Sequence, residues 1–275
     1  MAPSDVRDAP IDVLGDDDLD AALALTAEAG WNQVAADWRL MLRLGSGFAI
    51  RDGGRAVATA IALPYPPAFG WVSMVLVHTP YRRLGLATRL VERATAALTD
   101  AGLVAVLDAT PAGAGVYGPM GFRPVGNLMR WRGPGGGGGS SEPEPEIVRD
   151  LDLDRDAFGA DRSAILADLA ARPAPVAIAA GADGYLLSRA GRTGSQIGPL
   201  VARDATAAVT LLAAGLDTLA GTAIVDVSEQ ATAVAAHLAG RGFTQERPYV
   251  RMALGRDSIA GTPTLVHTIA GPELG

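Results

Sequence analysis

The segment Arg82-Arg83-Leu84-Gly85-Leu86-Ala87 lies between an apolar run, Trp71–Val77, and a helix-like stretch, Thr88–Thr99. The apolar run predicts a buried strand, and the later stretch has the apolar spacing of a helix. A strand that enters a helix through a glycine turn leaves several backbone N–H groups unpaired at the positive end of the helix dipole. The sequence therefore predicts an anion-binding turn at Gly85.

The residues after this turn extend the pattern. A second strand is predicted at Leu103–Ala109, and Thr110-Pro111 opens a short helix that carries Tyr117 and ends at Gly121-Phe122. This order of strand, Arg-x-x-Gly-x-Ala turn, helix, strand and tyrosine helix resembles the GCN5-related N-acetyltransferase (GNAT) superfamily over residues 1 to about 133. The resemblance implies an α/β fold, in which helices flank a mixed, mostly antiparallel sheet.

A segment rich in glycine, proline and glutamate divides the chain. Residues 133–146 read Gly-Pro-Gly-Gly-Gly-Gly-Gly-Ser-Ser-Glu-Pro-Glu-Pro-Glu, a composition typical of a flexible coil followed by a stiffer spacer. Each side is long enough for one domain. We predict a catalytic domain at 1–133, a linker at 134–146, a second domain at 147–255 and a tail at 256–275.

The second half weakly repeats the first. The matching segments are a strand at Ile197–Ala202, a turn at Arg203–Ala208, a helix at Ala208–Leu219, a strand at Ile224–Ser228 that corresponds in sequence to Val106–Thr110, and Gly242-Phe243, which corresponds to Gly121-Phe122. Thr206 replaces Gly85, and Leu238 replaces Tyr117. We therefore expect a degenerate copy of the same fold with a structural, dimer-forming or substrate-shaping role, and a site of its own is the alternative. In the tail, Leu265–Ile269 is a candidate strand.

Two strings carry a further resemblance. Phe158–Arg162 and Ile197–Ala202 are similar to tandem acyltransferases whose second half looks like the YitH/HolE-type acetyltransferase domain. The fold expected for the whole chain is thus two tandem GNAT-like lobes.

The composition and net charge exclude several classes of partner and of chemistry. The 275 residues carry a formal net charge of −7, which argues against a nucleic-acid partner and favours cationic substrates. No apolar run is long enough to cross a membrane, so we expect a cytoplasmic protein without a membrane partner, monomeric or homodimeric. Because the chain lacks cysteine, it has no thiolate metal site and cannot hold an acyl group on sulfur, which favours direct transfer. We expect no metal.

The resemblance implies acetyl-CoA as co-substrate. Amides of the turn would bind its pyrophosphate with added charge from the arginines, and free main-chain groups of the preceding strand would pair with the pantetheine arm and polarise the thioester. The positions that match are Arg82, Arg83, Leu84, Gly85, Leu86, Ala87 and Thr88 in the turn, and Val75, Leu76 and Val77 in the strand.

Tyr117, five residues before Phe122, matches the tyrosine that protonates the CoA thiolate in this family. The alternative is a tyrosine that only packs its ring. Many relatives carry an asparagine seven residues before the tyrosine, and Thr110 stands there in this chain. Thr110 replaces one hydrogen bond at most.

The general base and the acceptor contacts are less specific. Asp108 shares a strand face with Thr110 and is a candidate to relay a proton from an ammonium substrate, or else to cap the following helix. Water alone is a further candidate for the base. Asn32 and Asp37 are candidate amine ligands, whereas Trp38 has the spacing of a core residue.

These features predict an acetyl-CoA-dependent N-acetyltransferase that acts on a primary amine of a small molecule or peptide through a ternary complex. Two alternatives remain at this stage. One is a transferase that uses another acyl-CoA or an oxygen acceptor, and the other is a CoA-sensing module without turnover.

Overall fold

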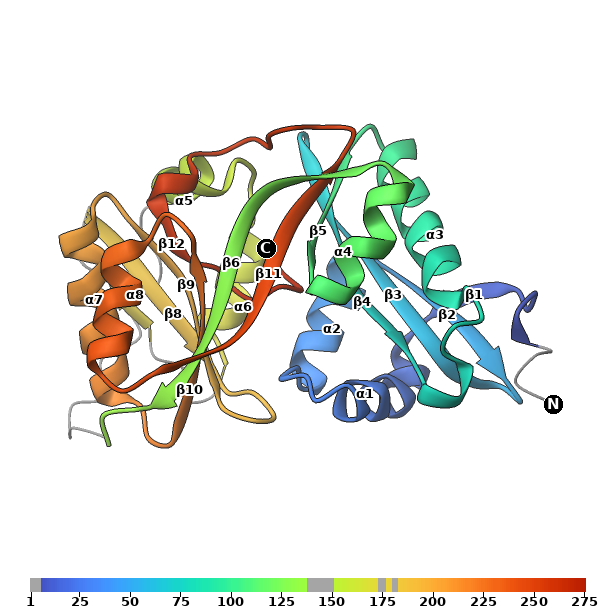
Figure 1. Cartoon of the computed structure of the whole chain (residues 1–275), viewed down its shortest axis with the longest axis horizontal. Helices are drawn as coiled ribbons and strands as arrows, with labels where there is room; N and C mark the ends of the chain where they lie inside the picture. The colour runs from blue at the N-terminus through green and yellow to red at the C-terminus, as the bar shows by residue number, and fades with distance from the viewer. Residues whose placement is uncertain (1–5, 138–150, 173–176, 180–182) are drawn as a thin grey trace. The chain divides into compact units, whose positions relative to one another are not determined.

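The computed structural model describes residues 6–137, 151–172, 177–179 and 183–275 (Figure 1). Contacts divide the chain into two compact units, residues 1–107 and 108–275, which we call unit 1 and unit 2. The predicted linker lies outside the described residues from 138 onward, and no helix in the described part is long and apolar enough to cross a membrane.

Unit 1 is a sheet of five strands in the order β1-β2-β3-β4-β5, in which only the β4–β5 pair is parallel. In Figure 1, α1 and α2 lie on one side of β3 and α3 lies on the other, which agrees with the burial of nearly every β3 residue. The elements are β1 (Ile11–Leu14), α1 (Leu19–Glu28), α2 (Ala35–Leu44), β2 (Ser46–Asp52), β3 (Arg55–Tyr65), β4 (Phe69–Val77), α3 (Leu86–Asp100) and β5 (Val104–Ala109).

Unit 2 holds the remaining strands in the order β11-β6-β10-β12-β9-β8-β7, with a parallel pairing of β9 with β10. Its helices are α4 (Pro111–Tyr117), α5 (Leu151–Phe158), α6 (Ser163–Ala170), α7 (Ala205–Thr218) and α8 (Thr232–Gly240). Its strands are β6 (Phe122–Pro134), β7 (Ala177–Ala179), β8 (Gly184–Arg189), β9 (Ser195–Ala202), β10 (Thr222–Ser228), β11 (Thr244–Leu254) and β12 (Val266–Thr268).

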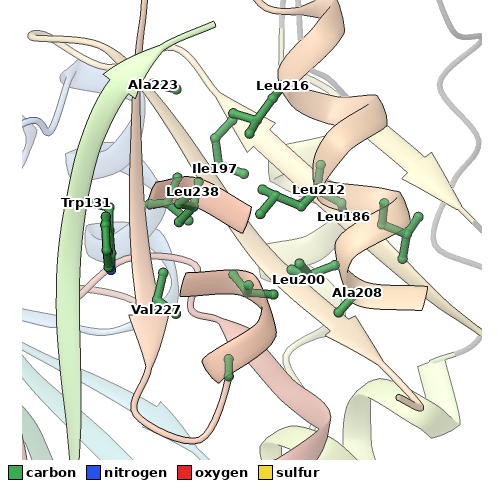
Figure 2. Close-up of a cluster of buried hydrophobic side chains, with 14 of the residues drawn as sticks. Trp131, Leu186, Ile197, Leu200, Ala208, Leu212, Leu216, Ala223, Val227 and Leu238 are labelled. Carbon is green, nitrogen blue, oxygen red and sulfur yellow. The ribbon is translucent and has the colours of Figure 1, made fainter. Parts of the chain in front are cut away.

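The core of unit 2 lies between α7, α8 and the sheet. Figure 2 shows Leu212 and Leu216 of α7 and Leu238 of α8 gathered against Ile197 and Leu200 of β9, and all five are fully buried. Leu238 takes the position of Tyr117 in the repeat, so a packed aliphatic side chain stands at the place of the proposed acid.

The predicted elements of both repeats are confirmed, including the tail strand β12. The mixed α/β class is confirmed as well. The compact units, however, divide inside β5, because β6 pairs with β10 on one edge and with β11 on the other. The first linker residues also belong to unit 2: the amide of Gly135 donates to the carbonyl of Gly221 at 2.7 Å.

Candidate functional site

A bulge in β4 begins the candidate site. Met74 has a φ of 49°, and the register between β3 and β4 shifts by one residue there, so Thr59 faces Leu76 whereas Ile61 faces Ser73. The buried Thr59 hydroxyl donates to the Met74 carbonyl at 2.9 Å. This side chain gives the carbonyl a hydrogen-bond donor within the bulge.

We expect Thr59→Val to lower the free energy of unfolding by about 1–3 kcal/mol, because the buried Met74 carbonyl then lacks its donor. Urea unfolding of the full chain measures this change. Thr59→Ser keeps the hydroxyl and serves as the control. A valine variant as stable as the serine variant would contradict the role given to the hydroxyl.

Beyond the bulge, β4 separates from β5. The two strands pair only at Phe69–Trp71, opposite Val104–Val106. The amide of His78 donates to the Val57 carbonyl at 2.9 Å, and the alternation of an antiparallel ladder therefore turns the main-chain groups of Val77 away from β3.

The predicted pantetheine positions lie in the part of β4 that does not pair with β5. Val75 shares the orientation of Val77, and Leu76 between them pairs with Thr59. The Val77 carbonyl accepts a hydrogen bond from Arg82 Nε at 3.1 Å. The amide of Val77 and the main-chain groups of Val75 thus face the β5 side of β4, beyond the last residue that pairs with β5.

The turn after β4 has the geometry of an anion site. Gly85 is the N-cap of α3 with φ 81°, a left-handed conformation, and no described side chain accepts a hydrogen bond at this cap. The amides of Leu86, Ala87 and Thr88 therefore begin the helix without an intrahelical acceptor. Arg82 and Arg83 are exposed beside them, while the buried Leu86 anchors the turn in the core.

The matching turn of the second half is closed by its own side chain. Asp204 caps α7, and its carboxylate accepts from the amides of Thr206 and Ala207 at 2.8 and 2.9 Å. The helix N-terminus already holds a negative charge, so a phosphate would meet repulsion and occupied donors. This geometry agrees with the prediction that the second copy is degenerate.

Tyr117 ends α4 in unit 2 and is half-buried. Its ring lies 6.2 Å from that of Phe122, centroid to centroid, and its burial raises the pKa of the phenol above the ordinary value. Thr110 is the N-cap of this helix and accepts from the amide of Gly113 at 3.2 Å. Tyr117 belongs to unit 2, whereas the Gly85 turn belongs to unit 1.

Asp108 lies in a buried ion pair that the sequence did not predict. Arg251 of β11 donates to both its carboxylate oxygens, at 2.8 and 2.9 Å. Burial raises the pKa of Asp108, and the Arg251 guanidinium opposes this shift. Thr110, rather than Asp108, caps the following helix.

A second ion pair repeats this arrangement. Asp226, the counterpart of Asp108 in the repeat, accepts from Arg130 of β6 at 2.8 and 2.7 Å. Arg130 follows Phe122 by eight residues, and Arg251 follows Phe243 by eight. Each half thus supplies the aspartate of one pair and the arginine of the other.

The two remaining substrate candidates are buried in unit 1. Asn32 is 5% exposed and Asp37 is 1% exposed. The Asp37 carboxylate accepts from the amide of Val34 at 2.9 Å and so helps to start α2. Their contact with a substrate stays a prediction. Trp38 is a core residue, as predicted, and its indole donates to Thr26 Oγ1 at 3.0 Å.

Unit 1 also contains a cavity of about 200 Å³ between α1, the β2–β3 turn and the end of β4. Glu28 lines it and accepts from the amide of Thr79 at 2.8 Å, with His78 Nδ1 at 2.6 Å from the other oxygen. The hydrogen bond from the Thr79 hydroxyl, followed by that from His78, lowers the pKa of Glu28 to about 2. Sequence reasoning missed Glu28, because nothing in the sequence links it to a turn 50 residues later.

A model described as "Acetyltransferase (GNAT) family" matches residues 18–122, and one described as "Acetyltransferase (GNAT) domain" matches 151–266. Together they cover more than half of the chain. The chain belongs to the GNAT superfamily. It is a tandem GNAT protein and an acetyltransferase, and the family implies acetyl-CoA as co-substrate.

Individual relatives agree with this GNAT assignment. The chain is 26% identical to the uncharacterized N-acetyltransferase YitH of Bacillus subtilis (strain 168), over 85% of this chain and 87% of that one. A putative acetyltransferase from Pyrococcus horikoshii superposes with a TM-score of 0.82 at 19% identity, covering 97% and 95%. A tandem GNAT protein from the clavulanic acid biosynthesis pathway gives 0.58 at 16%, covering 89% and 97%. At these identities the two structures show the GNAT fold.

The described residues contain no group of three or more acidic or histidine side chains that would hold a metal ion.

Proposed function

We propose that this protein transfers an acetyl group from acetyl-CoA directly to a primary amine of a small molecule or peptide, in a ternary complex. The observation that carries the proposal is the left-handed Gly85 turn, which joins the open edge of β4 to the uncapped N-terminus of α3. We keep the domain limits that the sequence predicts: residues 1–133 for the catalytic domain and 147–255 for the second domain.

The turn residues 82–88 bind the pyrophosphate in this proposal. The two phosphate groups of the pyrophosphate can accept hydrogen bonds from the convergent amides of an uncapped helix start, and the exposed Arg82 and Arg83 add positive charge. Val75 and Val77 present the edge that would pair with the pantetheine arm and polarise the thioester carbonyl, whereas Leu76 between them faces β3 with its main-chain groups. An ordinary strand-to-helix turn requires neither the bulge nor the separation of β4 from β5.

Tyr117 is the proposed general acid. The amine nitrogen attacks the thioester carbonyl, a C–N bond forms, the C–S bond breaks, and the departing thiolate takes the phenol proton. An ordinary phenol has a pKa of about 10 and carries this proton at neutral pH, and burial raises the pKa of Tyr117 further.

Water is the proposed base: it takes the proton that the attacking nitrogen loses, and the Tyr117 phenolate regains its proton from solvent. The Asp108 carboxylate is fully buried, and both its oxygens accept hydrogen bonds from Arg251. We therefore propose that Asp108 acts on the acceptor indirectly, by holding the Arg251 side chain in place. Asn32 and Asp37 remain proposed acceptor contacts. The net charge of −7 favours a cationic amine.

We expect Tyr117→Phe to lower turnover at least about tenfold while the affinity for acetyl-CoA stays unchanged, since a positioned acid contributes about 10²–10⁴ in rate. Thiol release with a panel of amines measures turnover, and calorimetry measures affinity. Tyr249→Phe, a buried tyrosine of β11, is the control and should change neither.

Unchanged turnover of Tyr117→Phe at every pH would remove this residue from the mechanism. Heat of CoA binding without thiol release for any acceptor would favour a CoA-sensing module. Release with an alcohol or with a longer acyl-CoA would instead redefine the acceptor or the acyl group.

A further inference from the structure

The two halves contain matching gaps in their sheets. In unit 1, β4 and β5 pair in parallel over three residue pairs and then separate. In unit 2, β9 and β10 also pair in parallel over three, Ser195–Ile197 with Ala223–Val225, and then separate. The β10 segment is the counterpart of β5 in the sequence repeat. The gap after Ile197 therefore corresponds to the gap after Trp71.

The gap of unit 2 is filled by the tail of the same chain. The strand β12 pairs antiparallel with both of its neighbours, placing Thr268 opposite Leu200 of β9 and Val227 of β10. The amide of Ile269 then donates to the Asp226 carbonyl at 3.1 Å. Main-chain groups of the tail thus pair with the strand edges that diverge.

The strand edge is shaped for this tail. Gly198 has a φ of 140°, and a Cβ built there would collide with the carbonyl of Ile269. Ile269, Ala270 and Leu274 are completely buried. The fit requires glycine at 198, both for its backbone conformation and for the close approach of the tail.

Buried charges anchor the end of the tail. Arg189 donates to the Ala270 carbonyl and pairs with Glu273, with 3% of each side chain exposed. Arg162 Nη1 donates to the carbonyl of Gly275 at 3.1 Å. Removing the tail would leave these buried guanidinium groups without those acceptors, which is costly in a low-dielectric interior.

We propose that residues 266–270 are a built-in occupant of the second acyl-CoA channel, so that the chain binds one acyl-CoA, through unit 1. The proposal rests on the proposed function, in which the matching gap of unit 1 receives the pantetheine arm. The Asp204 cap closes the corresponding phosphate position at α7. The family model of the second half ends at residue 266, just where this strand begins.

Calorimetry of the full chain with coenzyme A tests the stoichiometry. We expect one site per chain, because the unit 2 channel is filled, and we expect Gly85→Val to weaken binding at that site by at least about 100-fold. Two sites in the unchanged chain would overturn the proposal. So would one site that survives Gly85→Val.

Hydrogen exchange of the same full chain provides a second test that does not need a bound ligand. The amides of residues 267–270 should exchange as slowly as those of central β10, and saturating coenzyme A should change their rates less than twofold. Fast exchange in the free chain, or at least tenfold faster exchange on adding coenzyme A, would overturn the proposal. If coenzyme A gives no heat at all, the proposed function fails, and the free-chain rates still decide whether the tail fills the gap.

Discussion

Gly85→Val is expected to lower acetyl-CoA affinity and kcat/KM by at least about 100-fold. Gly85 has a φ of 81°, a conformation that a β-branched residue avoids. Rotating this residue into an allowed region turns the helix-start amides away from the pyrophosphate. Losing two hydrogen bonds to a charged group, at about 1.5–3 kcal/mol each, exceeds the roughly 2.8 kcal/mol that corresponds to 100-fold.

Gly102→Val is the matched control for this variant. Gly102 follows the other end of α3 with a φ of 77°, and a Cβ added at Gly102 or at Gly85 would meet no atom within 4 Å. Both substitutions carry the same backbone strain, so their melting temperatures should fall by similar amounts. Calorimetry with coenzyme A should separate them. Equal affinities would show that the Gly85 turn does not bind the cofactor.

Asp226→Ala is expected to lower the free energy of unfolding by about 3–5 kcal/mol, because it leaves a buried guanidinium without its partner. Arg130 is 4% exposed and Asp226 is fully buried, and Gln196 Nε2 also donates to this carboxylate at 3.0 Å. Urea unfolding, followed by fluorescence, measures the loss.

Two further variants isolate the cause of this loss. Asp217→Ala removes a carboxylate that is 64% exposed and paired with Arg241, and it should cost under about 1 kcal/mol. The double variant Arg130→Met, Asp226→Leu removes both charges and should be more stable than Asp226→Ala alone. A single variant that loses as little as Asp217→Ala would contradict the importance of the buried pair.

Local patterns predicted much of the fold. The apolar run at Trp71–Val77, the helix after Gly85 and the strand at Leu103–Ala109 all correspond to observed elements, because burial and helix spacing are encoded within a dozen residues. The Gly85 turn was predicted as well, since glycine marks a left-handed position. The bulge at Met74 was not, because a methionine gives no such signal.

Long-range partners were beyond the sequence. Asp108 resembled a cap or a proton relay, yet it meets Arg251, 143 residues later in the chain. The tail strand was found, but its neighbours β9 and β10 were not, since period-two alternation reports a strand and not what it pairs with. The Asp204 cap is a local feature that the sequence does encode, since aspartate favours helix starts. It was missed because the alignment of the two halves places Thr206, and not Asp204, opposite Gly85.

The position of β6 between β10 and β11 has a consequence for synthesis. A ribosome releases β6 more than 80 residues before β10, and its second neighbour, β11, emerges later still. Both edges of β6 therefore stay unpaired until most of the polypeptide has been synthesised. Closing the long loop between β6 and β10 slows folding. A nascent chain arrested near residue 140 would hold β6 without either neighbour, so the amino-terminal half cannot complete this sheet during translation.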